Sequence, residues 1–155
     1  MPPKVKATPD GYHTATPYLV LQGAAAALDF YTKVFGATEF VRMAQPDGKI
    51  GHAEMRIGDS VVMLADEAPQ LGHRGPKALG GSPVSLLLYV EDVDAVMARA
   101  VAAGAKLTRP AEDQFYGDRN GIIEDPFGHI WCIATHTEDV SPEEMNKRMA
   151  AMSPK

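Results

Sequence analysis

Two short stretches of the sequence carry side chains that could do chemistry. In the first, GHAEMRI (residues 51–57), His52 and Glu54 are two positions apart, so on a strand they point to the same face. An imidazole beside a carboxylate can act as a general base and its orienting partner, or can bind a metal ion with help from a third ligand. The simpler interpretation, a polar patch of hydrogen bonds at a pocket edge, is favoured.

The second stretch, DPFGHIWCIATH (residues 125–136), holds two histidines and the only cysteine. His129 and His136 are seven residues apart and lie on opposite faces of a continuous strand. Cys132 and His136 share a face but are about 13 Å apart, too far for one metal ion. We expect a pocket-lining strand without a metal, in which His129 hydrogen-bonds to the turn, Trp131 lies in the core and Cys132 is a small hydrophobe rather than a nucleophile.

Tyrosines on two predicted strands are candidates for ligand contact. In the strand at residues 16–21, alternation turns Tyr18 to the same side as Thr16. In a later strand it turns Tyr89 to the same side as Ser85. A tyrosine ring can stack on a planar ligand while its hydroxyl orients a polar group. The alternative is that both rings fill space at the rim of a hollow.

The segment DQFYGDRNG (residues 113–121) adds a turn with further candidates, which are Phe115, Tyr116, Asp118 and Arg119. Arg119 could bind a carboxylate or phosphate with two parallel hydrogen bonds. We expect instead that it pairs with Asp118 or Glu124 and holds the loop.

Three helices are predicted, at residues 23–37, 91–105 and 141–152. The first ends at a glycine, and the third begins with a capping box and carries methionines along one face. In the second helix Asp92 can cap the first turn. Helical spacing there predicts one buried stripe, formed by Val93, Val96, Met97, Ala100 and Val101.

The remaining periodic segments predict eight strands, at residues 16–21, 39–43, 51–57, 60–66, 84–90, 106–110, 121–125 and 129–135. One long irregular stretch rich in glycine and proline, residues 67–83, divides the chain and suits a linker or a mobile flap.

The two halves of the chain repeat one order of elements: a strand, a helix and three strands. Thr16 and Ser85, in the opening strands, are 69 positions apart. Met63 and Cys132, in the closing strands, are also 69 positions apart. Two copies at so long a period predict an internally duplicated domain rather than a solenoid.

Composition excludes several classes of function. The chain has 155 residues, 45% apolar and 23% charged, which is typical of one soluble globular domain. The net charge of −5 and the absence of a basic run argue against nucleic acid or an anionic membrane as partner. A single cysteine permits no intramolecular disulfide, and we find neither a signal peptide nor an apolar run of membrane-spanning length. We expect a cytoplasmic protein.

Four motifs resemble the vicinal oxygen chelate superfamily, and its PhnB-like bacterial branch most closely: PYLVLQGAAAALDFYTKVFGA, PDGKIGHAEMRIGDSVVMLADE, YVEDVDAV and DQFYGDRNGIIEDPFGHIWCIATHTEDVSPEEM. This superfamily includes glyoxalase I, extradiol dioxygenases, fosfomycin-resistance enzymes and bleomycin-resistance binding proteins. The resemblance implies an α+β fold of two βαβββ modules, each a curved mixed sheet with its helix on the convex face, plus a C-terminal helix. It places the modules at about 14–66 and 83–137, with a linker at about 67–82, in one domain spanning 1–155, and implies a homodimer.

Metal-binding members of this superfamily carry a ligand on the first and last strand of each module. The resemblance maps these positions onto Thr16, Met63, Ser85 and Cys132. Two hydroxyls, a thioether and a thiol are poor ligands for a divalent ion that prefers imidazole and carboxylate. We therefore expect no metal and no other cofactor, and a divalent metal is the alternative.

The resemblance and the residues together predict a metal-free small-molecule-binding protein, similar to bleomycin-resistance proteins, that sequesters a planar or amphipathic ligand in a concave pocket. The expected ligand contacts are Thr16, Tyr18, His52, Glu54, Met63, Ser85, Tyr89, Tyr116, Arg119 and Cys132. The alternative is a glyoxalase-like enzyme of lyase, isomerase or dioxygenase type. It would act on a small oxygenated substrate through His52, Glu54 and Arg119, with or without a divalent metal.

Overall fold

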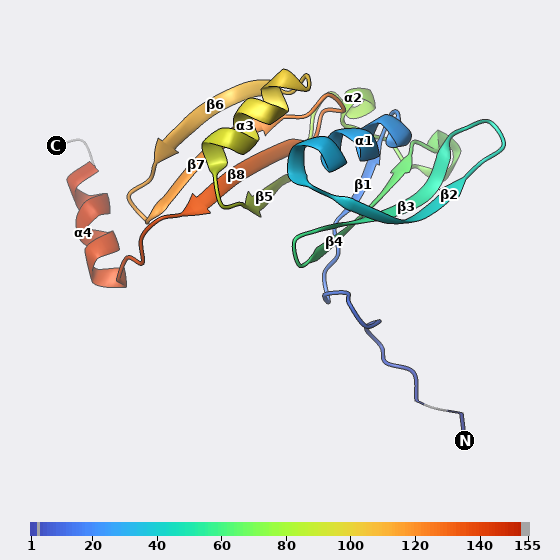
Figure 1. Cartoon of the computed structure of the whole chain (residues 1–155), viewed down its shortest axis with the longest axis horizontal. Helices are drawn as coiled ribbons and strands as arrows, with labels where there is room; N and C mark the ends of the chain where they lie inside the picture. The colour runs from blue at the N-terminus through green and yellow to red at the C-terminus, as the bar shows by residue number, and fades with distance from the viewer. Residues whose placement is uncertain (3, 153–155) are drawn as a thin grey trace. The chain divides into compact units, whose positions relative to one another are not determined.

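The computed structural model describes residues 1–2 and 4–152 and divides the chain into two compact units, Met1–Gly81 and Ser82–Lys155. Each unit contains one four-stranded sheet and the helix that packs on it (Figure 1). The α+β class and the two repeated modules predicted from the sequence are confirmed.

In unit 1 the chain runs through β1 (Tyr18–Leu21), α1 (Ala24–Phe35), β2 (Thr38–Ala44), β3 (Ile50–Ile57) and β4 (Ser60–Asp66). The spatial order is β1-β4-β3-β2, with β1 parallel to β4 and the other pairs antiparallel. Two short helical turns, η1 (Pro69–Leu71) and α2 (Pro76–Leu79), follow β4.

The alternation along β3 determines which side chains lie on the face that α1 covers and which lie on the opposite face. Ala53, Met55 and Ile57 are buried, and α1 contacts the strand that carries them. His52 and Glu54 therefore lie on the opposite face, as their parity predicted. We call this face, which also carries Tyr18, the open face of unit 1.

In unit 2 the order is β5 (Ser85–Tyr89), α3 (Val93–Ala102), β6 (Lys106–Asp113), β7 (Asp118–Glu124) and β8 (Ile130–His136), followed by α4 (Pro142–Met152). The sheet order is β5-β8-β7-β6, with the same pattern of directions as in unit 1. Trp131 is buried in its core, as predicted, and its indole N–H donates to Asp125 Oδ2 at 2.9 Å. The face that carries Tyr89 is the open face of unit 2.

The strand register supports the predicted duplication. Tyr18 pairs with Met63 across β1 and β4, and Leu87 pairs with Cys132 across β5 and β8. Both members of the second pair are 69 positions after their counterparts in the first. Residues 69 positions apart are thus paired in the same way between the first and last strands of the two sheets.

The predicted elements differ from the structure in detail. Val101 was expected in the buried stripe of α3 but is 45% exposed. Eight residues at 100° each turn it about 80° away from Val93, so the stripe ends at Ala100. The stretch 67–83 is not irregular throughout, because it forms η1, α2 and a bridge between Ala68 and His73.

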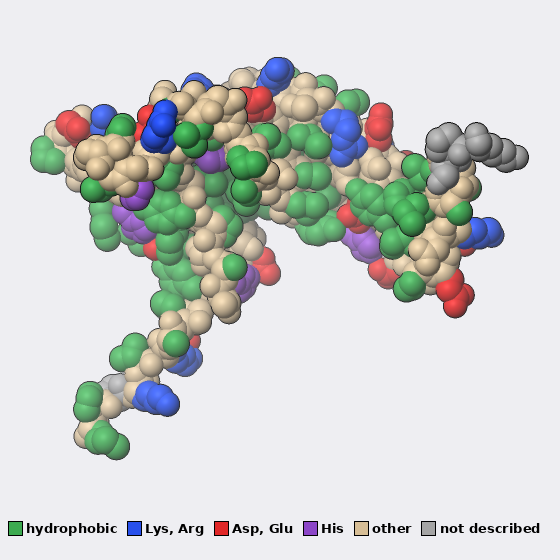
Figure 2. All heavy atoms as spheres, turned by 180° about the vertical axis from the view of Figure 1, so that it is seen from behind, with side chains coloured by type: hydrophobic (Ala, Val, Ile, Leu, Met, Phe, Trp, Pro, Cys, Tyr) green, Lys and Arg blue, Asp and Glu red, His purple; other side chains and the backbone are tan. Residues whose placement is uncertain are grey.

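The predicted caps of two helices are present. Asp92 Oδ1 accepts from the Ala95 amide at 3.0 Å, at the start of α3. Ser141 Oγ accepts from the Glu144 amide at 3.2 Å, at the start of α4, while the Glu144 carboxylate pairs with Arg148. Figure 2 shows hydrophobic side chains at the surface near the C-terminal end, where Met149 and Met152 are exposed.

Of the helices that the structure describes, none has the length and apolar character needed to cross a membrane. The cytoplasmic location stays a prediction.

Candidate functional site

A chain of hydrogen bonds crosses the open face of unit 1. The Tyr18 hydroxyl bonds to His52 Nδ1 at 2.8 Å, and His52 Nε2 bonds to Glu54 Oε1 at 3.1 Å. The other oxygen of Glu54 accepts a hydrogen bond from the hydroxyl of Tyr12. Strands β1 and β3 supply the first three residues, and the N-terminal segment supplies the fourth.

Glu54 is the most enclosed member of this chain, with only 7% of its surface exposed. Burial favours the neutral acid, but the hydrogen bonds from Tyr12 and His52 together outweigh it and lower the pKa of Glu54 below its usual value. The carboxylate is therefore ionised at neutral pH and needs donors on both oxygens.

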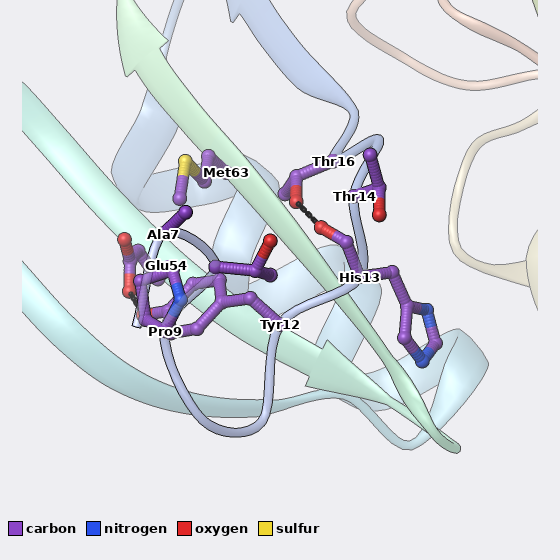
Figure 3. Close-up of a pocket in the computed structure, with 9 residues that line it drawn as sticks. Ala7, Pro9, Tyr12, His13, Thr14, Thr16, Glu54 and Met63 are labelled. Carbon is purple, nitrogen blue, oxygen red and sulfur yellow. Dashed lines mark hydrogen bonds between the residues drawn. The ribbon is translucent and has the colours of Figure 1, made fainter. Parts of the chain in front are cut away.

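A hollow of about 430 Å³ lies where the N-terminal segment, residues 7–16, passes over this face. Its walls include Thr16, Glu54 and Met63, three predicted ligand contacts, together with Tyr12 (Figure 3). The Thr16 hydroxyl donates to the backbone oxygen of His13 at 3.3 Å, which fixes the bend that leads into β1.

Tyr18 borders a second hollow of about 260 Å³, between the β2–β3 turn and the loop after β4. Lys49 and His73 also line it. Figure 2 shows histidines and hydrophobic side chains close together on the surface of unit 1. Tyr18 as a whole residue is 47% exposed, so part of its surface is available for stacking while its hydroxyl is held by His52.

The open face of unit 2 carries a comparable arrangement built from different residues. The Tyr89 hydroxyl donates to Asp118 Oδ2 at 2.8 Å, and His136 Nδ1 bonds to Asp118 Oδ1 at 2.7 Å. Asp118 is only 5% exposed, whereas Tyr89 is 60% exposed. Asp139 Oδ1 bonds to the other nitrogen of His136, Nε2, at 2.8 Å. The hydrogen bonds to Asp139, the larger effect, and to Asp118 both raise the pKa of this imidazole.

Two further predicted residues of unit 2 lie near this network. Tyr116 accepts a hydrogen bond from the buried Asn120 at 2.7 Å, so its hydroxyl is fixed. Cys132 is half-buried, and burial is the main cause that raises the pKa of its thiol. The thiol is therefore protonated at neutral pH, and its role in the site stays a prediction.

Arg119 does not have the partners that we predicted. Its guanidinium donates to both oxygens of Asp94 at 2.8 and 2.9 Å and to Asp113 at 3.3 Å, rather than to Asp118 or Glu124. The reason is strand parity: Asp118 points to the open face, so its neighbour in β7 points to the side of α3. An anion at Arg119 would have to displace Asp94.

Four residues of these networks were not predicted as site residues, namely Tyr12, Asn120, His136 and Asp139, which follows β8. Tyr12 lies before the first strand, where no periodic pattern indicates a direction. Asn120 follows the alternation of β7, so parity could have assigned it to the open face of unit 2, and parity did place His136 on the same face as Cys132.

The positions that the resemblance assigns to metal ligands do not suit a divalent ion. In unit 1 Thr16 and Met63 offer a hydroxyl and a thioether, and both oxygens of the neighbouring Glu54 already accept hydrogen bonds. In unit 2 Ser85 offers a hydroxyl at the exposed start of β5, and Cys132 offers a single thiol. Over residues 1–2 and 4–152, no group of three histidine, cysteine or acidic side chains is arranged to hold a metal.

Sequence and structure comparisons place the chain among known proteins. The model of the Glyoxalase/Bleomycin resistance protein/Dioxygenase superfamily matches residues 13–133. The chain is 45% identical over 139 residues to the uncharacterized protein Rv0887c of Mycobacterium tuberculosis, which covers 88% of this chain and 82% of that protein. It is 29% identical over 129 residues to the uncharacterized protein At5g48480 of Arabidopsis thaliana, covering 79% of this chain and 77% of that protein.

Solved structures agree with this match. The crystal structure of TioX from Micromonospora sp. ML1 superposes with a TM-score of 0.62 at 27% identity, over 80% of this chain and 98% of TioX. A PhnB protein from Bacillus cereus superposes with a TM-score of 0.63 at 19% identity, over 79% of this chain and 99% of that one, which shows a shared fold. The chain therefore belongs to the glyoxalase/bleomycin resistance protein/dioxygenase superfamily, as its four motifs predicted.

Proposed function

We propose that this protein binds a planar or amphipathic small molecule on its open faces, without a metal, as a sequestering protein of the bleomycin-resistance type. The observation that carries the proposal is that two tyrosines are exposed while their hydroxyls are held in place. Tyr18 and Tyr89 each expose about half or more of their surface, yet each hydroxyl is held by a hydrogen bond of 2.8 Å.

An exposed ring that is held in place suits stacking. A free tyrosine side chain loses rotamer freedom when a ligand orders it, whereas a ring tied by its hydroxyl has lost part of that freedom already. Leu87, which is also exposed, lies two residues before Tyr89 on the same face of β5 and adds apolar surface. The buried carboxylates Glu54 and Asp118 add polar groups that can orient a ligand.

The protonation of the candidate groups favours binding over covalent chemistry. Burial, followed by the charge of Glu54, raises the pKa of Tyr18, so this phenol is a weak base and a weak nucleophile at neutral pH. Burial raises the pKa of the Cys132 thiol as well. Tyr18 and Cys132 on the open faces thus keep their protons at neutral pH.

The proposal is tested by equilibrium dialysis of the protein against a panel of planar aromatic antibiotics. We expect saturable binding of at least one compound, weakened about tenfold or more by Tyr18→Ala or Tyr89→Ala, because a stacked aromatic contributes roughly 1–3 kcal/mol. Leu79→Ala is the control, since Leu79 is an exposed apolar residue of α2 that lines neither hollow of unit 1. Uniform absence of binding, or equal loss with Leu79→Ala, would contradict the proposal.

A glyoxalase-like enzyme is the second candidate, and one observation favours it. His52 lies between a hydroxyl and an ionised carboxylate, the arrangement in which a carboxylate orients a histidine for proton transfer. Elemental analysis of protein purified without chelators distinguishes sequestration from the metal-dependent form of this enzyme. Stoichiometric metal that is lost in His52→Ala would favour the enzyme, and protein that binds ligand with no bound metal would favour sequestration.

We also propose that the protein is a homodimer, as the resemblance implies. The exposed apolar residues on β2 and β6, which include Met43 and Leu107, support it because a partner subunit could cover them. Light scattering coupled to size-exclusion chromatography tests it, with a mass near twice 16.7 kDa expected. A mass of one chain at micromolar concentration would contradict it.

A further inference from the structure

The N-terminal segment, residues 7–16, inserts one of its own side chains into the site on unit 1. Tyr12 donates its hydroxyl proton to Glu54 and lines the hollow that Thr16 and Met63 also line (Figure 3). The segment forms no helix or strand, and Arg56 holds it by donating to the Gly11 carbonyl at 3.4 Å, near the upper limit for a hydrogen bond. It is therefore attached to the sheet more weakly than the strands are to one another.

Glu54 shows why Tyr12 occupies this position. The carboxylate is enclosed and ionised, and His52 satisfies only one of its oxygens. An enclosed charged acceptor that lacks a donor is costly. The hydrogen bond to Glu54 raises the pKa of Tyr12, so the hydroxyl keeps its proton and serves as that donor.

We propose that the site on unit 1 binds a flat aromatic molecule carrying a phenolic hydroxyl, and that this hydroxyl replaces the Tyr12 hydroxyl at Glu54. The inference rests on the proposed binding function and specifies its ligand. Tyr12 is itself a phenol in the hollow, so the N-terminal segment is an internal competitor that leaves when the ligand enters.

The positive charge of Arg56 near Glu54 favours a neutral hydrogen-bond donor, rather than a cation, as the ligand group that binds Glu54. Arg56 lies two residues further along β3 and therefore on the same face as Glu54. Its guanidinium lies over the ring of Phe40, 5.4 Å from the ring centre, so a positive charge is fixed on this face. The Arg56 charge opposes the attraction between a cationic ligand and Glu54, whereas a neutral phenol gains the bond to Glu54 without that opposition.

The first test compares 2-naphthol with 2-methoxynaphthalene, which have the same rings but differ in the hydroxyl proton. By fluorescence titration we expect 2-naphthol to bind about tenfold more tightly, the value of one hydrogen bond to a charged acceptor. Glu54→Gln should reduce this preference to about twofold or less. Glu112→Gln, which changes an exposed carboxylate of β6, is the matched control and should keep the preference.

The second test uses Tyr12→Phe, which keeps the ring but removes the competing hydroxyl. This variant should bind 2-naphthol several-fold more tightly than the wild type and retain the preference over 2-methoxynaphthalene. Unchanged or weaker binding would overturn the inference, because Tyr12 would then be a wall of the site or irrelevant to it. This test stands even if Glu54→Gln fails to fold.

Release of the segment can be observed directly in the wild-type protein. Saturating 2-naphthol should accelerate chymotrypsin cleavage after Tyr12, measured by mass spectrometry, whereas protection would overturn the inference. If the wild type and Tyr12→Phe bind neither naphthalene, the proposed function and this inference fail together. If both compounds bind equally and Tyr18→Ala weakens both, only the phenol inference fails.

Discussion

Single residues give the two open faces their chemistry. On unit 1 the hydroxyl of Tyr18 is tied to a histidine, and on unit 2 the hydroxyl of Tyr89 is tied to a buried aspartate. In both cases the hydroxyl is anchored to a polar group while about half or more of the residue is exposed. This geometry suits a ligand that is apolar on its faces and polar at an edge.

The histidine of unit 2 should make folding stability depend on pH. Asp139 and Asp118 raise the pKa of His136 above its unfolded value, so the protonated form is preferred in the folded state. Its contribution is complete below the unfolded pKa of about 6.5 and is lost as the pH rises through the folded value. Urea unfolding of wild type and His136→Gln should therefore differ more at about pH 5.5 than at about pH 8.5. A difference that is equal at both values, or larger at the higher one, would contradict this assignment.

Strand parity predicted the directions of many individual side chains in the site, but not of all of them. It placed His52 and Glu54 on the open face and Trp131 in the core. Applied to Arg119 as well, it would have corrected the expected pairing, because Asp118 and its neighbour cannot share a face. Tyr12 could not be predicted, since a segment without regular structure has no period from which to infer a direction.

At the scale of elements, a carboxylate on β4 holds three segments of unit 1 together. Asp66 Oδ1 accepts from the amides of Gly23 and Ala24 at the start of α1, and Oδ2 accepts from the amide of Ile50 on β3. A negative charge at a helix N-terminus is favourable in itself. In unit 2 the hydroxyl of Thr135 on β8 accepts from the amide of Val93 at the start of α3. In both units, therefore, a side-chain oxygen on the last strand of the sheet holds the start of the helix.

Replacing Asp66, which also lines the second hollow, should destabilise the protein. Asp66→Ala leaves three backbone donors without their acceptor, and we expect the free energy of unfolding to fall by roughly 2–4 kcal/mol in urea denaturation. Asp59→Ala is the matched control, because that carboxylate lies in the exposed β3–β4 turn and accepts from Ser60. The control should cost about 0.5 kcal/mol or less, and equal losses would contradict the role assigned to Asp66.

The sequence predicted elements well where side chains alternate and poorly where they do not. All eight strands and three helices were found from their periods. The β6–β7 hairpin was predicted too short, because its last pairs, Glu112 with Asn120 and Asp113 with Arg119, are polar on both faces. The helix α2 has only four residues, which is too short to show a helical period.

At the scale of the whole chain, one topology carries two different sites. Met63 and Cys132 occupy the same place in their sheets, but the residue opposite Met63 on β3 is Glu54 and the residue opposite Cys132 on β7 is Ile122. The duplication therefore keeps the strand order and varies the chemistry. This difference predicts that only unit 1 prefers ligands that can donate a hydrogen bond to Glu54. In unit 2 the polar group that a ligand would meet is Asp118.

Chemical-shift mapping tests the central claim most directly, because it reports both whether a ligand binds and where. Nitrogen-15-labelled protein would be titrated with 2-naphthol and followed by two-dimensional NMR. Saturable shifts should be concentrated in β1, β3 and β4, or in β5, β7 and β8, around Tyr18 and Tyr89. Shifts confined to α1 and α3, or none that saturate, would show that the open faces are not binding surfaces.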